Sequence, residues 1–476
     1  MPNLQKLDLK RLKEILTEEH EITLEPPKIP ERFRRIKSFR DFWNALTWRD
    51  IECIAALPAL IFFLCPLYFF YRVLDPNRWI MWAYVSDTIY FLCVVTGVPA
   101  LLLAIGKCCC DRTILRQYSR QNRITAGCFL IFVLLMILHT DIYGWSELEI
   151  FGNEMNYEST LTYLSYFLIF FWCSAIIRSS EVKRIIVYFG LLTSLQQGVL
   201  NLIDGLVCPL SPMRIAWPGG YSSVYFNPNH YGYYLTVGIM LSVGVAAWDK
   251  QRVWRILGAL SFAVQSVVLN LNNTLGCFLA VLVGIVFMAI MDRIVKRKIS
   301  RRVILLFCAY IGLAVFVSVF DRNIFDSIRE FGFDLSKLLH DSDDKMLGGS
   351  GRVVLWYYTI LFIIEKPLLG YGVEGIAGRL SDAAGLVRAH NIYLEYTSFF
   401  GIPAMLLFLI GIFCIFLNGL KKKAVLDDAV MTILAAAFGF AVSGCFGISI
   451  FYTTPYFFIL LGLGFSIIPS GKTDSQ

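Results

Sequence analysis

The chain of 476 residues is 57% hydrophobic and only 17% charged, with a mean hydropathy of +0.62. No soluble domain of this size has such a composition, which is that of an all-α, polytopic helical membrane protein. The formal net charge of +7 comes from basic residues spread over loops between apolar segments, so it does not indicate nucleic-acid binding.

Residues 1–50 are polar and are expected to form a cytoplasmic N-terminal arm. We therefore expect no cleavable signal peptide, and the first span acts as the insertion signal. Residues 4–16 carry leucine and isoleucine at helical spacing, which predicts a short amphipathic helix. Residues 32–48 interleave basic, aromatic and aliphatic side chains. This pattern is typical of a helix on the anionic inner face of a lipid bilayer, or of a helix packed on the protein's own loops.

We predict a transmembrane domain over residues 51–470 with about twelve spans. The predicted spans are 51–71, 80–106, 124–140, 159–177, 185–206, 229–248, 256–271, 274–291, 303–320, 391–419, 430–447 and 449–468. The seventh and eighth are short and almost contiguous, so they are either two spans with little tilt or a pair in which one is re-entrant.

The distribution of Lys and Arg predicts the orientation. Roughly three quarters of the 43 basic residues fall in alternate segments that include both termini, whereas the short loops on the other side carry three. Cytoplasmic loops are the ones enriched in basic residues, so we expect both termini to be cytoplasmic. The long segment 321–389, between the ninth and tenth spans, is then an external loop.

This external loop contains an apolar run over residues 353–364. A helix of this length covers about 18 Å, short of the ~30 Å hydrocarbon core, so it is expected to lie along the membrane or dip into it. Pro367 stops it, and Gly370 and Gly372 favour a tight turn. Ser350 is the expected N-cap, which puts Arg352 in the first helical turn.

Among the five histidines, His390 alone combines an external membrane-edge position with a nearby cation, Arg388. Asn391 follows it as the expected cap of the next span. A cation at each end of a membrane-associated segment indicates a site for an anionic, lipid-attached substrate. His230, at the mouth of the sixth span, is the alternative functional histidine. Because no pair of His or Cys residues has metal-ligand spacing, no metal site is expected.

Two stretches of this region carry a family resemblance. SGRVVLWYYTILFIIEKPLLGYG followed by AHNIYLEYTSFFGIPAMLLFL resembles the signature region of the O-antigen ligase and O-antigen polymerase superfamily. FNPNHYGYYL is similar to the Asn-Pro-Asn segment that opens a span in that family. The motifs occur in the expected order, and the resemblance covers about residues 185–420.

The resemblance implies a GT-C-like inverting glycosyltransferase of the bacterial plasma membrane. Its donor would be an undecaprenyl-diphosphate-linked glycan, and its acceptor a hydroxyl of a sugar or lipid-linked glycan. His390 matches the essential histidine of the family and Arg352 its loop arginine, and Arg214 occupies roughly the place of another arginine. Where the family has a Ser-Arg-Gly-like element, NNTLG stands here, which leaves the contribution of Asn272 and Asn273 open.

The chemistry of these residues fits that activity. The planar guanidinium of Arg352, with that of Arg214, pairs with diphosphate oxygens and replaces a metal ion. His390 takes the proton of the acceptor hydroxyl, and the rate is expected to rise with pH across about 6–7. The substrate-binding residues are expected to include Asn229, Asn391 and Arg388. The activated donor supplies the energy, so no cofactor is required.

The sequence does not distinguish a polymerase from a ligase, and it does not identify the sugars that are transferred. A protein of another class, a non-enzymatic glycolipid flippase or polysaccharide exporter, is the alternative function. Transporters of that kind tend to show internal repeats with charged or broken spans in matching halves, and this sequence shows no such symmetry.

The predicted orientation leads to a labelling experiment on intact cells. In a cysteine-reduced variant, Lys345→Cys is expected to react with a membrane-impermeant thiol reagent, because position 345 lies in the external loop. Lys298→Cys is the matched control and is expected to react only after the cells are opened. Labelling in the reverse pattern would overturn the orientation and with it the external site.

Overall fold

The structure is a computed structural model that describes residues 31–73, 98–110, 120–152, 158–203, 225, 227–319, 324–339, 351–373, 375–421 and 427–466. All regular elements in these ranges are helices. The chain divides into two compact units, Met1–Thr47 and Trp48–Gln476. In the first unit, the helix predicted over residues 32–48 is divided into α2 (Glu31–Arg34) and α3 (Phe39–Ala45), with Ser38 capping α3. The helix predicted over residues 4–16 lies outside the described residues.

Each predicted span contains a helix of the second unit. These are α4 (Trp48–Val73), α6 (Val98–Cys110), α7 (Arg120–Tyr143), α9 (Thr160–Ile176), α10 (Ser180–Leu202), α12 (Pro228–Trp248), α13 (Arg252–Asn272), α14 (Leu275–Val295), α15 (Arg301–Ser318), α19 (Ile392–Lys421), α20 (Asp428–Ser443) and α21 (Thr454–Phe465). Among the described helices, eight are long and apolar enough to cross a membrane, while α6, α9 and α21 are shorter. The expected polytopic helical membrane protein is confirmed.

The helices α13 and α14 are both long enough to be the seventh and eighth spans, as the first of the two alternatives requires. Each has 21 residues, and only Asn273 and Thr274 separate them. At about 1.5 Å per residue, either helix is long enough to cross the hydrocarbon core. Asn273 has a φ of 55°, in the left-handed region that Asn tolerates better than most residues. The tight turn therefore follows from the residue at this position.

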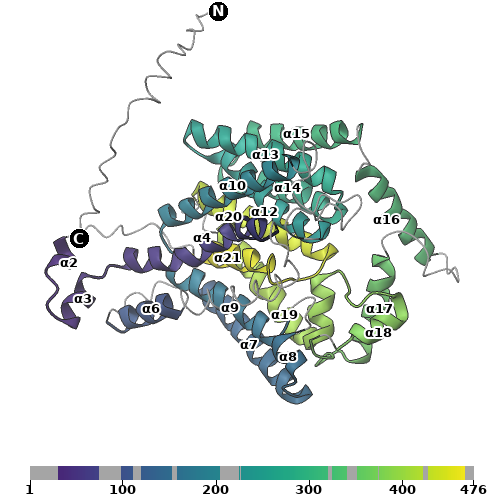
Figure 1. Ribbon diagram of the computed structural model, residues 1–476, viewed down its shortest axis with the longest axis horizontal. Coiled ribbons are helices and arrows are strands. Elements are labelled where there is room, and N and C mark those ends of the chain that lie inside the picture. The colour runs from purple at the N-terminus through teal and green to yellow at the C-terminus, as the bar shows by residue number, and fades with distance from the viewer. Residues whose placement is uncertain are drawn as a thin grey trace, which may run out of the picture. The chain divides into compact units, whose positions relative to one another are not determined.

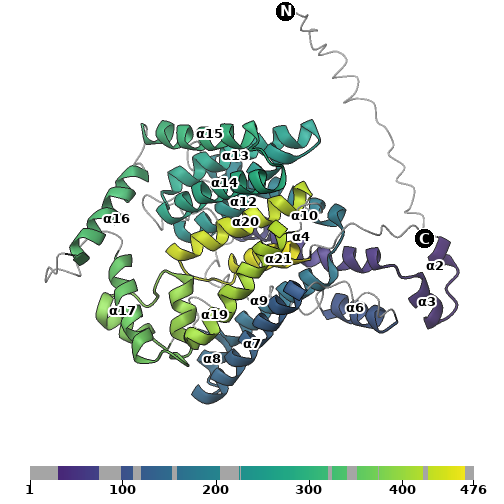
Figure 2. The ribbon, with the colours of Figure 1, turned by 180° about the vertical axis from the view of Figure 1, so that it is seen from behind.

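α12 is the helix around which the second unit packs. The apolar window over its length is entirely buried, and it contacts α10, α13, α14 and α20. In both ribbon views, α13 and α15 lie on one side of it and α21 and α19 on the other (Figures 1 and 2). A Cβ atom at Gly238 would lie 2.0 Å from Gln265 Oε1, so glycine permits the close approach of α13. Small residues of this kind are typical of helix contacts inside membranes.

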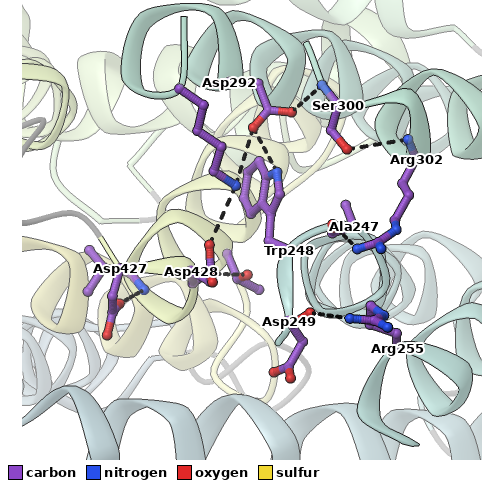
Figure 3. A network of polar contacts seen from close by, with 12 residues as sticks. Ala247, Trp248, Asp249, Arg255, Asp292, Ser300, Arg302, Asp427 and Asp428 are labelled. Carbon is purple, nitrogen blue, oxygen red and sulfur yellow. Dashed lines mark hydrogen bonds and ion pairs between the residues drawn. The ribbon is translucent and has the colours of Figure 1, made fainter. Parts of the chain in front are cut away.

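A polar network joins four helices at the end of α12 that carries Trp248 (Figure 3). Asp292 of α14 accepts hydrogen bonds from Trp248 Nε1 (2.9 Å) and from the backbone N–H of Ser300 (2.9 Å). Lys296 Nζ lies 3.5 Å from Asp292 and 3.5 Å from Asp428 of α20. The fully buried Asp292 carboxylate is thus satisfied by donors from its own and two neighbouring elements, as a buried charge requires.

The described part of the region predicted as the external loop contains three helices. They are α16 (Ile324–Leu339), α17 (Arg352–Glu365) and α18 (Ala377–Ala384), and they gather at one edge of the unit in both views (Figures 1 and 2). The ring of Phe331 on α16 lies 6.2 Å from that of Trp356 on α17. α17 packs against α19. Outside this loop, α8 (Glu147–Phe151) follows α7, and the 3-10 helix η6 (Gly444–Phe446) follows α20.

α19 is broken at Gly401, and the break holds the turn that follows α17. The φ of Gly401 is 85°, so the regular helical hydrogen bonds stop there. The backbone N–H groups of Tyr371 and Gly372 donate to the carbonyls of Ser398 (2.8 Å) and Phe399 (3.0 Å). The N–H of Ile402 donates to the Pro367 carbonyl at 2.8 Å. The backbone groups that the break exposes are therefore satisfied by the turn.

The expected tight turn after Pro367 is present. Gly370 and Gly372 have φ values of 67° and 90°, in the left-handed region. Tyr143 Oη donates to the Gly370 carbonyl at 2.8 Å, so the end of α7 also holds the turn. α17 is a helix of 14 residues, as the apolar run predicts, and this turn fixes its end against α19.

Replacement of Gly401 tests the importance of this backbone contact. A Cβ atom at Gly401 would lie 2.1 Å from the Leu368 carbonyl oxygen, and the positive φ disfavours any other residue. Gly401→Ala is expected to lower the free energy of unfolding by more than about 2 kcal/mol, measured by thermal unfolding in detergent. Gly127→Ala on α7, where nothing lies within 4 Å, is the control and is expected to be neutral or stabilising. Equal effects of the two substitutions would contradict the role of the break.

Candidate active site

Arg352 is the first residue of α17 and reaches the start of α12. Its Nη2 donates to Oδ1 of Asn229 at 2.8 Å, although the two residues are 123 positions apart in the chain. The N-cap of α17 is Gly351, with a φ of 65°, rather than the expected Ser350, which lies outside the described residues. Arg352 is nevertheless in the first turn, as predicted. Its contact with Asn229 is to a neutral amide, so this partner does not compensate the guanidinium charge.

The Asn-Pro-Asn segment opens α12 as the sequence predicts. Asn227 is the N-cap, and its Oδ1 accepts from the backbone N–H of Asn229 at 2.8 Å. Pro228 occupies the first turn, where its missing N–H costs nothing. Asn229 is then held by the cap at its backbone and by Arg352 at its side chain. The segment thus places one polar side chain at the mouth of the span.

His390 lies between two anchored residues. Its own φ is 51°, an uncommon value for a residue other than glycine, so the surrounding structure must maintain it. On one side, Oδ1 of Asn391 accepts from the N–H groups of Tyr393 (3.0 Å) and Leu394 (3.1 Å), which caps α19 as expected. On the other side, Arg388 is held by a buried ion pair.

That ion pair is the bidentate contact of Arg388 with Glu395. Nε and Nη2 of Arg388 each lie 2.9 Å from one carboxylate oxygen, and both residues are buried. Paired and doubly hydrogen-bonded charges are the arrangement in which burial of ions is tolerated. Because residues 388 and 395 flank His390 and the first turn of α19, the pair fixes the backbone that carries the imidazole.

A second buried carboxylate, Glu158, acts on Arg388. Glu158 accepts from Tyr166 Oη and Ser449 Oγ, at 2.6 Å each. Burial raises the pKa of Glu158, and the nearby Arg388 charge opposes that rise. The sequence reasoning missed Glu158 and Glu395. A signal was present, because a carboxylate at or inside an apolar span seldom lacks a partner.

The positive charges around His390 affect its protonation. Burial, Arg352 and Arg388 together lower the pKa of His390 to about 4. A pKa this low keeps the imidazole neutral at pH 7 and moves the expected pH limb below the range of about 6–7 that the unperturbed imidazole predicts. The sequence alone does not reveal this shift, since it depends on burial and on two charged side chains, Arg352 and Arg388, that approach His390 only in the fold.

His230 also belongs to this cluster. It is buried at the start of α12, and it interacts electrostatically with His390 and Arg388. Its Nδ1 forms a short hydrogen bond with Tyr452 Oη, from the segment before α21. His230 was the alternative histidine on the sequence, and its partner Tyr452 was missed because no pattern singles it out.

The structure thus brings together five of the six predicted site residues: Arg352, Asn229, His390, Arg388 and Asn391. Arg214 lies outside the described residues. In the described ranges, no group of three or more His, Cys, Asp or Glu side chains is arranged to hold a metal ion. The cluster offers a guanidinium that a neutral amide orients, together with a neutral imidazole in an electropositive setting. Such a site can bind an anion and accept a proton from a hydroxyl beside it.

Comparison with known proteins adds one finding. The family model described as O-Antigen ligase matches residues 259–409, which is less than half of the chain and includes Arg352 and His390. The match is consistent with the O-antigen ligase and polymerase family. It supports enzymatic glycosyl transfer in cell-surface polysaccharide assembly, with lipid-linked glycans as substrates. No curated protein matches the chain.

The lowered pKa of His390 predicts the pH dependence of catalysis. At low donor concentration, where kcat/KM reports the free enzyme, the rate is expected to be constant from about pH 5.5 to 8 and to fall as the imidazole is protonated near pH 4. Enzyme returned to pH 7 after each assay serves as the control for inactivation. A reversible limb at pH 6–7 under these conditions would contradict the lowered pKa.

Proposed function

We propose that this protein is a metal-independent, membrane-embedded glycosyltransferase of the bacterial plasma membrane. It transfers a glycan, with inversion, from an undecaprenyl-diphosphate-linked donor to a hydroxyl of a sugar or lipid-linked acceptor at the outer face. The observation that carries the proposal is the contact of Arg352 with Asn229 beside His390, because this cluster places an anion-binding group next to a neutral base. The family match over residues 259–409 supports the same class of reaction.

Arg352 is proposed to bind the donor diphosphate. Its guanidinium can pair with two phosphate oxygens, and the neutral Asn229 amide orients it without cancelling its charge. When the bond between the anomeric carbon and the diphosphate oxygen breaks, its electron pair stays on that oxygen. Arg352 stabilises the developing negative charge, with Arg214 as the second proposed cation.

His390 is proposed to be the general base. A ring nitrogen takes the proton of the acceptor hydroxyl as that oxygen attacks the anomeric carbon from the face opposite the diphosphate. A base with a pKa of about 4 is weak, but the bound diphosphate brings negative charge next to Arg352. This compensates one of the charges that lower the pKa of His390, so the imidazole becomes a stronger base once the donor is bound.

The other predicted residues hold this arrangement. Asn391 caps α19 with its side-chain oxygen, and we propose that its amide group contacts the substrate from that position. Arg388 adds positive potential to the substrate site while its ion pair with Glu395 fixes the His390 backbone. Asn229 contacts the donor beside the guanidinium it orients.

The alternative function, a non-enzymatic flippase or exporter, predicts a different outcome in one assay. Purified protein reconstituted in liposomes is given a labelled undecaprenyl-diphosphate oligosaccharide. A transferase forms products with new glycosidic bonds, whereas a flippase moves the label across the bilayer without new bonds. The size of the labelled product therefore separates the two functions.

Two substitutions test the proposed roles in the same assay. His390→Ala leaves the Asn391 cap in place, so it is expected to insert and to bind donor normally, and to transfer about 10²- to 10⁴-fold more slowly. Arg352→Lys keeps the charge but loses the planar fork and is expected to lose about ten- to a hundredfold. If His390→Ala kept more than about a tenth of the native rate, another residue would have to be the general base, and His230 would be the next candidate. Full activity of Arg352→Lys would show that donor binding requires only a positive charge at this position and not the two-point contact of a guanidinium.

A further inference from the structure

The turn between α13 and α14 holds the start of α12 through two side chains. Asn272 Nδ2 donates to the Pro228 carbonyl oxygen at 3.1 Å, and Thr274 Oγ1 donates to the same oxygen at 3.2 Å. Both side chains are buried, at 3% and 6% exposure. One backbone oxygen thus accepts from two side chains of a neighbouring turn.

Neither donor is needed to make the turn itself. The left-handed position is Asn273, and the two flanking positions have no conformational requirement for a polar side chain. The Thr274 hydroxyl also donates to the side-chain oxygen of Asn272, so its single hydrogen is shared between this oxygen and the Pro228 carbonyl oxygen. This contact fixes which way the Asn272 amide faces, because it leaves Nδ2 directed at Pro228. The pair is therefore organised toward the start of α12.

The Pro228 carbonyl oxygen, to which Asn272 and Thr274 donate, lies next to the candidate active site. Pro228 directly precedes Asn229, whose side-chain oxygen accepts from Arg352 at 2.8 Å. A shift of the Pro228 peptide would move Asn229 and change the direction in which Asn229 holds the Arg352 guanidinium. Displacements of about 1 Å at a reacting centre can lower the rate a hundredfold, so the loss of a hydrogen bond that fixes this peptide is expected to lower the rate of catalysis.

The same turn also contacts α16. Asn273 Oδ1 accepts from Ser327 Oγ at 3.1 Å. A series of hydrogen bonds therefore runs from α16 through the turn to the start of α12 and on to Arg352 at the start of α17. The three residues Asn272, Asn273 and Thr274 belong to the NNTLG sequence, which departs from the element expected in the resembling family.

We propose that Asn272 and Thr274 are positioning residues that fix Asn229, and through it the guanidinium of Arg352, for donor binding. The proposal rests on the proposed function of Arg352 as the diphosphate ligand. Asn272 and Thr274 act through the Pro228 peptide and do not touch the substrate. Their effect therefore passes through Asn229 and disappears when the Asn229 side chain is absent.

The test measures glycan transfer by the purified, full-length protein in liposomes, with labelled undecaprenyl-diphosphate oligosaccharide as the probe. Thr274→Val is isosteric and removes one donor, and Asn272→Ala removes the other. Each is expected to lower kcat/KM for the donor about three- to tenfold, as the loss of one hydrogen bond does. Thr274→Ser keeps the hydroxyl and is expected to stay within about twofold of the native protein. Thr193→Val on α10, which loses a buried hydroxyl bonded to its own helix at 3.0 Å, is the matched control and is expected to remain active.

Double substitutions separate positioning from a general loss of stability. In an Asn229→Ala background, Asn272→Ala and Thr274→Val are expected to change the rate by less than about twofold, because the residue through which they act is gone. Undiminished effects in that background, or full activity of both single variants, would overturn the proposal. If Arg352→Lys is also fully active, the proposed function fails as well. If Arg352→Lys is impaired while Asn272→Ala and Thr274→Val are fully active, the positioning proposal fails alone.

Discussion

The break in α19 at Gly401 creates backbone groups that cannot be left without partners in a membrane protein. An unpaired peptide group costs several kcal/mol in the hydrocarbon region, so irregular backbone is tolerated only where other protein groups satisfy it. Here the turn after α17 supplies them, through Tyr371, Gly372 and Pro367. The contact joins the end of α17 to the middle of α19. Because Arg352 begins α17 and His390 lies two residues before α19, the spacing of the two proposed catalytic groups depends on this backbone pairing.

A second constraint is the balance of charge around His390. Arg388 is compensated by Glu395 in direct contact and by Glu158 at longer range, so it can be buried beside a histidine without disrupting the loop. Arg352, by contrast, donates to the neutral side-chain amide of Asn229. The two cations therefore have different partners: Arg388 holds the backbone around His390 through its ion pair, and Arg352 is oriented by the neutral amide of Asn229.

The sequence predicted local features well where one residue determines them. Asn391 is a cap because its short side chain reaches the N–H groups at the start of a helix. The glycines after Pro367 adopt positive φ because no other residue does so at low cost. The predicted cap Ser350 was wrong, since Gly351 takes the left-handed conformation at that place.

The sequence by itself determined the helical membrane architecture and pointed to the candidate site motifs, since apolar segments and caps are local properties. The tertiary structure alone decided which polar groups meet. Arg352 contacts Asn229 across 123 positions, and Glu158 approaches Arg388 from the start of another span. It also decided the lowered pKa of His390, which sums burial with two charges from different segments. Interactions of this kind depend on distances between helices, and no period or motif within a single segment encodes those distances.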